Sequence, residues 1–145
     1  MIRYVALLAG VMAMAYASFA AATSRSTMAS ISAKPLMDAT DNIIGQKIVY
    51  PAGTPQIQSE LIVIPPGQVT EWHTHAVPMY AYLIEGELSI DYGEKGLKSL
   101  KSGEAMLEAQ NWPHRGKNIS KAPAKVLVVY IGAAGVPVEQ ASSPH

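Results

Sequence analysis

The sequence contains no cysteine, no excess of charge of either sign, and only four histidines and one phenylalanine in 145 residues. Without cysteine, the chain forms no disulfide, offers no thiolate nucleophile and cannot build a zinc site on sulfur ligands. Eleven basic residues balance eleven acidic ones, so no net field attracts nucleic acid or an anionic membrane surface. Stability must therefore come from a packed apolar core.

The first 22 residues differ in composition from the rest. Arg3 precedes an apolar stretch from Val5 to Tyr16, and small residues follow in the pattern that a signal peptidase accepts. We interpret residues 1–22 as an export signal cleaved near Ala17, Ala20 or Ala22. The alternative is an uncleaved membrane anchor, which needs about 20 apolar residues. After cleavage, the mature protein is expected in the periplasm or outside the cell, free of the membrane.

The remaining chain has room for one domain. Residues 23–41 are rich in serine, threonine and alanine and follow neither a helical nor a strand period, so we interpret them as an N-terminal arm. Residues 42–133 carry the regular pattern of a folded domain with a core. Residues 134–145, with Pro137 and Pro144, are expected to form a loose C-terminal tail.

The predicted domain consists of short apolar runs between glycine and proline residues, without a long amphipathic helix. Segments such as Pro65-Pro66-Gly67 and Lys101-Ser102-Gly103 place proline where a strand stops and glycine where a turn needs positive φ. This pattern predicts an all-β barrel or sandwich. The expected strands are Ile43 to Tyr50, Ile57 to Ile64, Val69 to His75, Met79 to Ile84, Glu87 to Tyr92, Leu97 to Leu100, Ala105 to Glu108 and Lys125 to Ile131.

Two of these runs, Leu61 to Ile64 and Val126 to Ile131, are apolar on both alternating faces. In a small barrel only one face of a strand points inward, so the outer face must meet something else. The arm before Asp41 and a second subunit are the two candidates. We favour a homodimer.

Three of the four histidines are spaced in a way that indicates a metal site. Imidazole is the commonest side-chain ligand of transition metals. In a strand over residues 69–75, Glu71, His73 and His75 share one face, and His114 must arrive from a distant strand to complete the group. The alternative is a metal-free barrel in which the histidines are hydrogen-bonded groups of the core or cleft.

The spacing of these residues resembles the two sequence motifs of the cupin family. The first motif is matched by Gly67, His73, His75 and Gly86, and the second by Gly103, His114 and Asn118. Ala109 and Asn111 stand where the second motif usually has proline and glycine. The motifs span residues 67–118, and the strand pattern extends the likeness from about residue 43 to 131. The resemblance implies a single jelly-roll-type cupin barrel with a metal ion on the three histidines.

The chain departs from the family at the acidic ligand of the first motif. That position falls at Met79, or at Tyr80 with a longer spacing, and neither side chain is a carboxylate. Three neutral imidazoles leave the charge of a divalent ion uncompensated and keep a coordination position open. Met79 is a candidate thioether ligand, and Tyr80 and Glu71 are candidate catalytic groups. Core packing for Met79 and Tyr80, and a rim salt bridge for Glu71, are the alternatives.

Three residues near the second motif are candidates for a substrate pocket. Trp112 could line its mouth, Arg115 could attract a carboxylate or enolate, and Asn118 could orient a ligand or hold a turn.

The resemblance implies a divalent transition metal, with iron ahead of copper, manganese, nickel or zinc. It favours a dioxygenase-like enzyme for a small enolate, diketone or phenolic compound, with an isomerase or lyase as alternatives. A non-catalytic metal- or small-ligand-binding cupin of the periplasm is the competing hypothesis.

Overall fold

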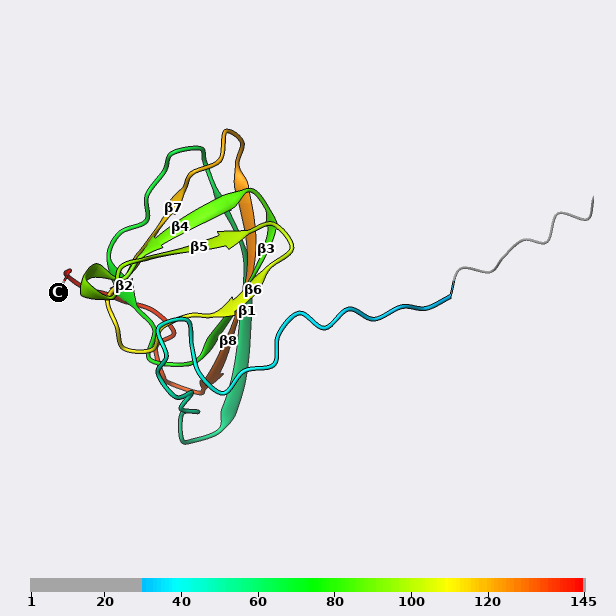
Figure 1. Ribbon diagram of the computed structural model, residues 1–145. Coiled ribbons are helices and arrows are strands. Elements are labelled where there is room, and N and C mark those ends of the chain that lie inside the picture. The colour runs from blue at the N-terminus through cyan, green and yellow to red at the C-terminus, as the bar shows by residue number, and fades with distance from the viewer. Residues whose placement is uncertain (1–29, 145) are drawn as a thin grey trace, which may run out of the picture. The chain divides into compact units, whose positions relative to one another are not determined.

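The computed structural model describes residues 30–144 (Figure 1). The predicted export signal and the first part of the predicted arm lie outside the described residues. Within that range the regular elements are strands, apart from one short 3-10 helix, which confirms the all-β prediction. No helix in the described range is long and apolar enough to cross a membrane. All strands belong to the compact unit that begins at Lys34.

Antiparallel pairing arranges the strands into two main sheets and one short ribbon. The first sheet has the order β1-β8-β3-β6, the second β5-β4-β7, and the ribbon pairs β2 with β9. Figure 1 shows the two larger sheets on opposite sides of the barrel. The elements are β1 (Pro55–Ile64), β2 (His73–Thr74), β3 (Met79–Glu85), β4 (Glu87–Asp91), η1 (Gly93–Lys95), β5 (Leu97–Lys101), β6 (Ala105–Leu107), β7 (Arg115–Asn118), β8 (Ala124–Ala133) and β9 (Gln140–Ala141).

The core lies between the two sheets because the strands alternate apolar residues inward. On the central strands β3 and β8, inward positions are no more than 7% exposed, namely Met79, Ala81, Leu83, Val126, Val128 and Tyr130. Leu88 and Ile90 of β4 and Leu100 of β5 meet them from the other sheet. Full burial of each large aliphatic side chain contributes about 1.5–3 kcal/mol. This packing fixes the barrel that carries the histidines.

Glycine is required at the turn between β3 and β4. Gly86 has φ of 94°, and a Cβ atom at this position would lie 2.8 Å from the Cβ of Ala124. A side chain there would strain the backbone and collide with β8. The Gly86 of the first motif is therefore needed for this turn.

Two predicted strands are shorter or absent. Residues 43–50 form turns and an isolated bridge between Asp41 and Lys47, because the Asn42 side chain accepts the N–H groups of Ile44 and Gln46 and holds the backbone in a loop. The strand expected over residues 69–75 is reduced to β2, with isolated bridges at Val69 and His75 on either side.

The C-terminal segment was expected to be loose, and the structure holds it against the barrel. Its strand β9 pairs with β2, opposing Ala141 to His73 and Gln140 to Thr74. Beyond β9, the N–H of Ser142 donates to the carbonyl of Trp72. Val136 and Val138 pack on the core. Residues 136–142, which we call the C-terminal strap, are therefore part of the folded domain.

The outer face of the first sheet is only partly covered. Arm residues from Leu36 to Ala39 line a depression with Tyr80, Leu107, Val129 and Ile131. The outward side chains of β1 remain open, since Ile57, Leu61 and Val63 are 62%, 59% and 53% exposed. The described part of the arm thus accounts for part of the cover that the sequence required, and within residues 30–144 the outward side chains of β1 have no such cover.

Candidate metal centre

The three predicted histidines come together at one end of the barrel. His73 lies on β2, His75 follows β2, and His114 immediately precedes β7. His73 and His114 face each other in an antiparallel bridge, in which each backbone N–H donates to the other's carbonyl over 3.0 Å. One ring nitrogen from each histidine lies within 4.8 Å of those of the other two. These three residues could hold a metal ion.

Each imidazole ring is oriented by a backbone carbonyl. The Nδ1 atoms of His73, His75 and His114 lie 2.8, 2.9 and 2.9 Å from the carbonyl oxygens of Glu71, Val138 and Trp112. Since a carbonyl only accepts, each Nδ1 carries the proton and each Nε2 presents a lone pair. The Nε2 atoms of His75 and His114 are buried and have no hydrogen-bond partner. An orphaned lone pair of this kind is what a metal ligand requires.

Burial keeps two of the rings neutral. His75 is 1% exposed and His114 is 2% exposed. Desolvation lowers the pKa of His75 to about 3, against a smaller opposing effect of its hydrogen bond to Val138. Desolvation also lowers the pKa of His114, although the neighbouring Glu108 carboxylate acts in the opposite direction. Neutral imidazole is the form that binds metals, so the environment favours ligation over protonation.

The loop before His114 needs an unusual backbone at Asn111. This residue has φ of 52°, in the left-handed region that glycine and asparagine tolerate best. Its N–H donates to the carbonyl of His75 over 2.8 Å, which ties the two histidine-bearing segments together. Asparagine therefore replaces the glycine that is usual at this point of the second cupin motif.

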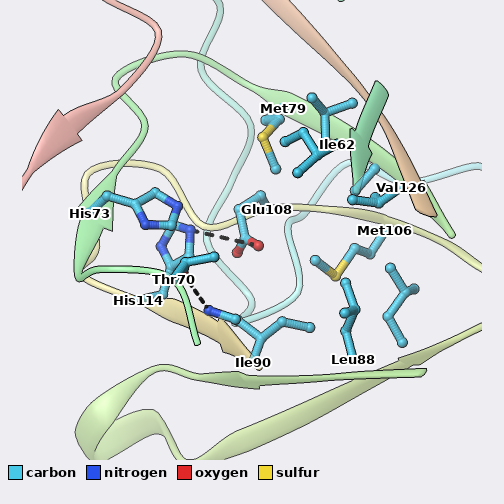
Figure 2. Close-up of a pocket in the computed structure, with 14 residues that line it drawn as sticks. Ile62, Thr70, His73, Met79, Leu88, Ile90, Met106, Glu108, His114 and Val126 are labelled. Atoms are coloured by element: carbon cyan, nitrogen blue, oxygen red, sulfur yellow. Dashed lines mark hydrogen bonds and ion pairs between the residues drawn. The ribbon is translucent and has the colours of Figure 1, made fainter. Parts of the chain in front are cut away.

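Two cavities meet at the histidines. The inner cavity, of about 80 Å³, lies within the barrel and is mostly apolar, and Figure 2 shows His73, His114, Glu108 and Thr70 at one end of it. The outer cavity, of about 330 Å³, is lined by Glu71, Trp72, His75, Tyr130 and Glu139 among others. Both cavities share His73, Met79 and Thr70 in their walls.

The candidates for the missing fourth position lie in different places. Met79 is buried and lines both cavities, so position 79 faces the histidines. Tyr80 is the next residue of β3 and points to the outer face, where it lines the depression beneath the arm. Glu71 is exposed at the wall of the outer cavity, and its backbone carbonyl is what contacts His73. The position of Tyr80 corrects its assignment as a catalytic group, because alternation along the strand turns it away.

The three predicted pocket residues make structural contacts, and one of them, Trp112, contacts the histidine site directly. Trp112 donates its indole N–H to the carbonyl of Tyr92, and its own carbonyl orients His114. Arg115 pairs with Asp91 and lies 4.7 Å over the ring of Trp72. Asn118 is fully buried, donates to the carbonyls of Ile64 and Ala122, and so holds a turn. None of the three is among the residues that line the two cavities within the described chain, and their role in a substrate pocket stays a prediction.

Two contributors to the site were not predicted. Glu108 is 4% exposed, lines the inner cavity and has its Oε2 atom 3.7 Å from Nε2 of His114. The expected strand from Ala105 to Glu108 could have indicated that Glu108 points inward, because alternation places it on the same face as Met106. The Val138 carbonyl that orients His75 is the other contributor. Because every residue has a backbone carbonyl, the residue type at position 138 does not predict this contact.

The fold and the histidine group define a β-barrel protein with a candidate metal centre inside one end. Residues 60–130 match the family model described as a cupin domain. The chain belongs to the cupin family, as its motifs suggested. Among curated proteins, no sequence matches it.

Solved structures agree on the fold. Oxalate decarboxylase of Lactobacillus farciminis, in a formate complex, is 19% identical with a TM-score of 0.52 over 62% of this chain and 27% of its own. The DMSP lyase DddQ of Ruegeria pomeroyi is 17% identical, with a TM-score of 0.53 over 61% of this chain and 44% of its own. Bacillus subtilis oxalate decarboxylase is 20% identical, with a TM-score of 0.52 over 61% and 24%. This chain thus spans about a quarter of either decarboxylase.

Proposed function

We propose that this small cupin binds one divalent transition-metal ion through His73, His75 and His114. The observation that supports the proposal most strongly is the orientation of the rings, with every Nδ1–H bonded to a backbone carbonyl and buried Nε2 lone pairs left without a partner. Imidazole donors suit iron, copper, nickel and zinc, and manganese becomes compatible when an oxygen ligand is added. Iron is our first choice.

We further propose that the site is catalytic and that its substrate is small. When bound, a divalent ion polarises an oxygen donor or, if it is iron or copper, activates dioxygen. The outer cavity gives access to the histidines, and the apolar inner cavity offers space behind them for a compact hydrocarbon group. An enolate, a diketone or a phenolic compound combines such a group with oxygen donors. A dioxygenase-like oxidoreductase is the activity we favour, with isomerase or lyase chemistry as the alternative.

Two considerations bear on whether the site turns over a substrate. The structural neighbours named as an oxalate decarboxylase and a DMSP lyase indicate that this fold carries enzymes, although likeness at this level of identity extends to the fold alone. A non-catalytic carrier of metal or of a small ligand is the second candidate, and the small volume of the inner cavity favours it. Oxygen uptake by the iron-loaded protein with a panel of enolates and diphenols separates the two. Uptake lost in His75→Ala supports the enzyme, and absence of uptake with metal retained supports the carrier.

Export is part of the same proposal. The apolar stretch from Val5 to Tyr16 and the small residues after it support cleavage of residues 1–22 and a periplasmic or secreted mature protein. The balanced charge gives no reason to expect nucleic acid as a partner. A protein of an oxidising compartment without cysteine depends on packing, and a bound metal would add to its stability.

A further inference from the structure

A buried carboxylate lies beside the histidines, and its residue neighbours the position of the missing acidic ligand, because the N–H of Glu108 donates to the carbonyl of Met79 over 2.9 Å. Glu108 follows β6, and its Oε2 atom approaches Nε2 of His114 at 3.7 Å (Figure 2). We propose that Glu108 is the anionic ligand of the metal centre and that Tyr92 holds it in position. This inference rests on the proposed binding of metal by the three histidines.

The hydrogen bonds of Glu108 leave one oxygen free for the site. Its Oε1 atom accepts from the hydroxyl of Tyr92 and from the N–H of Ala109. Tyr92 is fully buried, and burial, followed by the nearby carboxylate, raises its pKa, so the phenol keeps its proton and donates. With Oε1 occupied by two donors, Oε2 is the atom directed at His114. A carboxylate oriented in this way is a typical metal ligand with its supporting hydrogen bonds.

The contact between Glu108 and His114 calls for a positive charge between them. The Nδ1–H of His114 donates to the Trp112 carbonyl, so Nε2 and Oε2 are both acceptors and repel each other when nothing lies between them. Among residues 30–144, Glu108 has no lysine or arginine as an ion-pair partner, although it is 4% exposed. A buried, unpaired carboxylate is costly. A divalent cation shared by the two atoms removes both the repulsion and the unpaired charge.

The distance is compatible with shared ligation. Two ligands bound to one ion at about 2.1 Å lie roughly 3.0–3.4 Å apart, for octahedral and tetrahedral geometry respectively. The observed 3.7 Å requires a movement of a few tenths of an ångström, which rotation about the side-chain bonds of Glu108 supplies. Three neutral imidazoles and one carboxylate then reduce a charge of +2 to +1. In this proposal the acidic ligand comes from the segment between β6 and His114 and not from the first motif.

Metal affinity of purified variants tests the proposal. We expect Glu108→Gln to weaken Co²⁺ binding at least tenfold in competition with a chromophoric chelator, since a carboxylate that only supported the site would already be worth about 10–100-fold. Glu108→Asp keeps the charge but shortens the reach, and should lose a similar amount. Tyr92→Phe removes one orienting bond and should cost three- to tenfold. The visible spectrum of bound Co²⁺ should change in intensity for Glu108→Gln, because a ligand is replaced.

The matched control is Glu139→Gln. Glu139 lines the outer cavity and acts electrostatically on His114, but within residues 30–144 it is exposed and makes no hydrogen bond or ion pair with the three histidines. Its variant should bind Co²⁺ within twofold of the wild type and with the same spectrum. Equal losses in Glu108→Gln and Glu139→Gln would overturn ligation in favour of a general field of negative charge.

Two further outcomes separate this inference from the proposed function. If His75→Ala abolishes Co²⁺ binding while Glu108→Gln and Glu108→Asp remain within twofold of the wild type, Glu108 is not a ligand and the histidine site stands. If the wild-type protein itself does not bind Co²⁺, both proposals fail. Should Glu108→Gln not fold, as judged by thermal unfolding, Tyr92→Phe and Glu108→Asp still decide the question.

Discussion

At the scale of single residues, the candidate site depends on three backbone carbonyls as much as on three imidazoles. The carbonyls of Glu71, Val138 and Trp112 accept from Nδ1 of His73, His75 and His114. They select the tautomer whose Nε2 atom is free and hold the rings at centroid separations of 4.5–5.1 Å. The backbone therefore orients the three imidazole rings independently of a bound metal ion.

Burial of these rings gives the metal-free protein a defined pH dependence. In the folded state the pKa of His75 is lowered to about 3, and that of His114 is also lowered, each chiefly by desolvation. In the unfolded chain a histidine takes up a proton near pH 6.5, so below that pH the unfolded state binds more protons than the folded state. Stability should therefore fall as pH drops from about 6.5 towards 3, by at most about 1.4 kcal/mol per pH unit for each histidine.

Urea unfolding of protein stripped with a chelator measures this effect. The expected result is a free energy of unfolding that decreases steadily from about pH 7 to about pH 5. His75→Gln should show a shallower decrease, because one of the shifted groups is gone. A wild-type curve that is flat over this interval would contradict the assignment of His75 as a neutral buried ring.

The sequence predicted the histidine group correctly but not its full chemistry. The alternation of His73 and His75 and the motif spacing of His114 were enough to place three imidazoles together. Glu108 was not predicted, because the cupin motif assigns the acidic ligand to position 79 or 80. A closer use of strand alternation beyond Met106 would have found it. The carbonyl of Val138 could not have been found, since every residue has one.

At the scale of elements, the C-terminal strap completes the site. Its strand β9 pairs with β2, which carries His73. The carbonyl of Val138, also in the strap, accepts from Nδ1 of His75. Tyr130 of β8 packs against His75 at 5.6 Å between ring centroids. The strap therefore fixes two histidines through main-chain contacts that do not depend on the identity of its side chains.

Removal of the strap should loosen the metal site more than the barrel. A protein that ends at Ala134 keeps β1 to β8 but loses the acceptor for His75 and the partner of β2. We expect its metal affinity to fall about 10–100-fold, as for other groups that orient a ligand. Chelator competition and thermal unfolding measure the two effects. The control ends at Ser142, which preserves β9 and the bond to Trp72, and should match the full chain.

An unchanged affinity in the protein that ends at Ala134 would show that the strap is not needed to orient His75.

The strap also shows that very short strands cannot be predicted from the sequence. Strands β1, β3, β4, β5, β6 and β8 were predicted close to their observed positions, because each is an apolar run between turn residues. The two-residue strands β2 and β9 carry none, and their pairing is decided by tertiary contacts.

At the scale of the whole molecule, the outer face of β1 and β8 is the unexplained surface. Ile57, Leu61 and Val63 point outward, and Leu61 lies opposite Leu127 in the register of the two strands. The sequence indicated that these strands need cover on both sides, and the part of the arm that the structure describes lines a depression that includes Ile131. We propose that a second copy of the chain covers β1, since an exposed apolar patch of this kind favours association.

Light scattering on the purified protein tests the proposed homodimer. The wild type should have twice the mass of one mature chain, and Leu61→Glu should have the mass of a single chain, because a charge in an apolar interface cannot be solvated. Leu97→Glu is the control, since Leu97 is 69% exposed on β5 of the other sheet and its replacement should leave the dimer intact. A wild-type mass of one chain would contradict the proposal.

The central claim is that three imidazoles with free Nε2 atoms hold one metal ion, and metal analysis tests it most directly. Purified protein should be loaded with Fe²⁺ or Co²⁺, freed of excess ion and analysed by mass spectrometry of the metal. The account predicts about one ion per chain in the wild type and almost none in His75→Ala, which keeps every residue of the hydrophobic core cluster and whose folding thermal unfolding checks. A wild type without metal, or a His75→Ala variant that keeps the same amount, would contradict it.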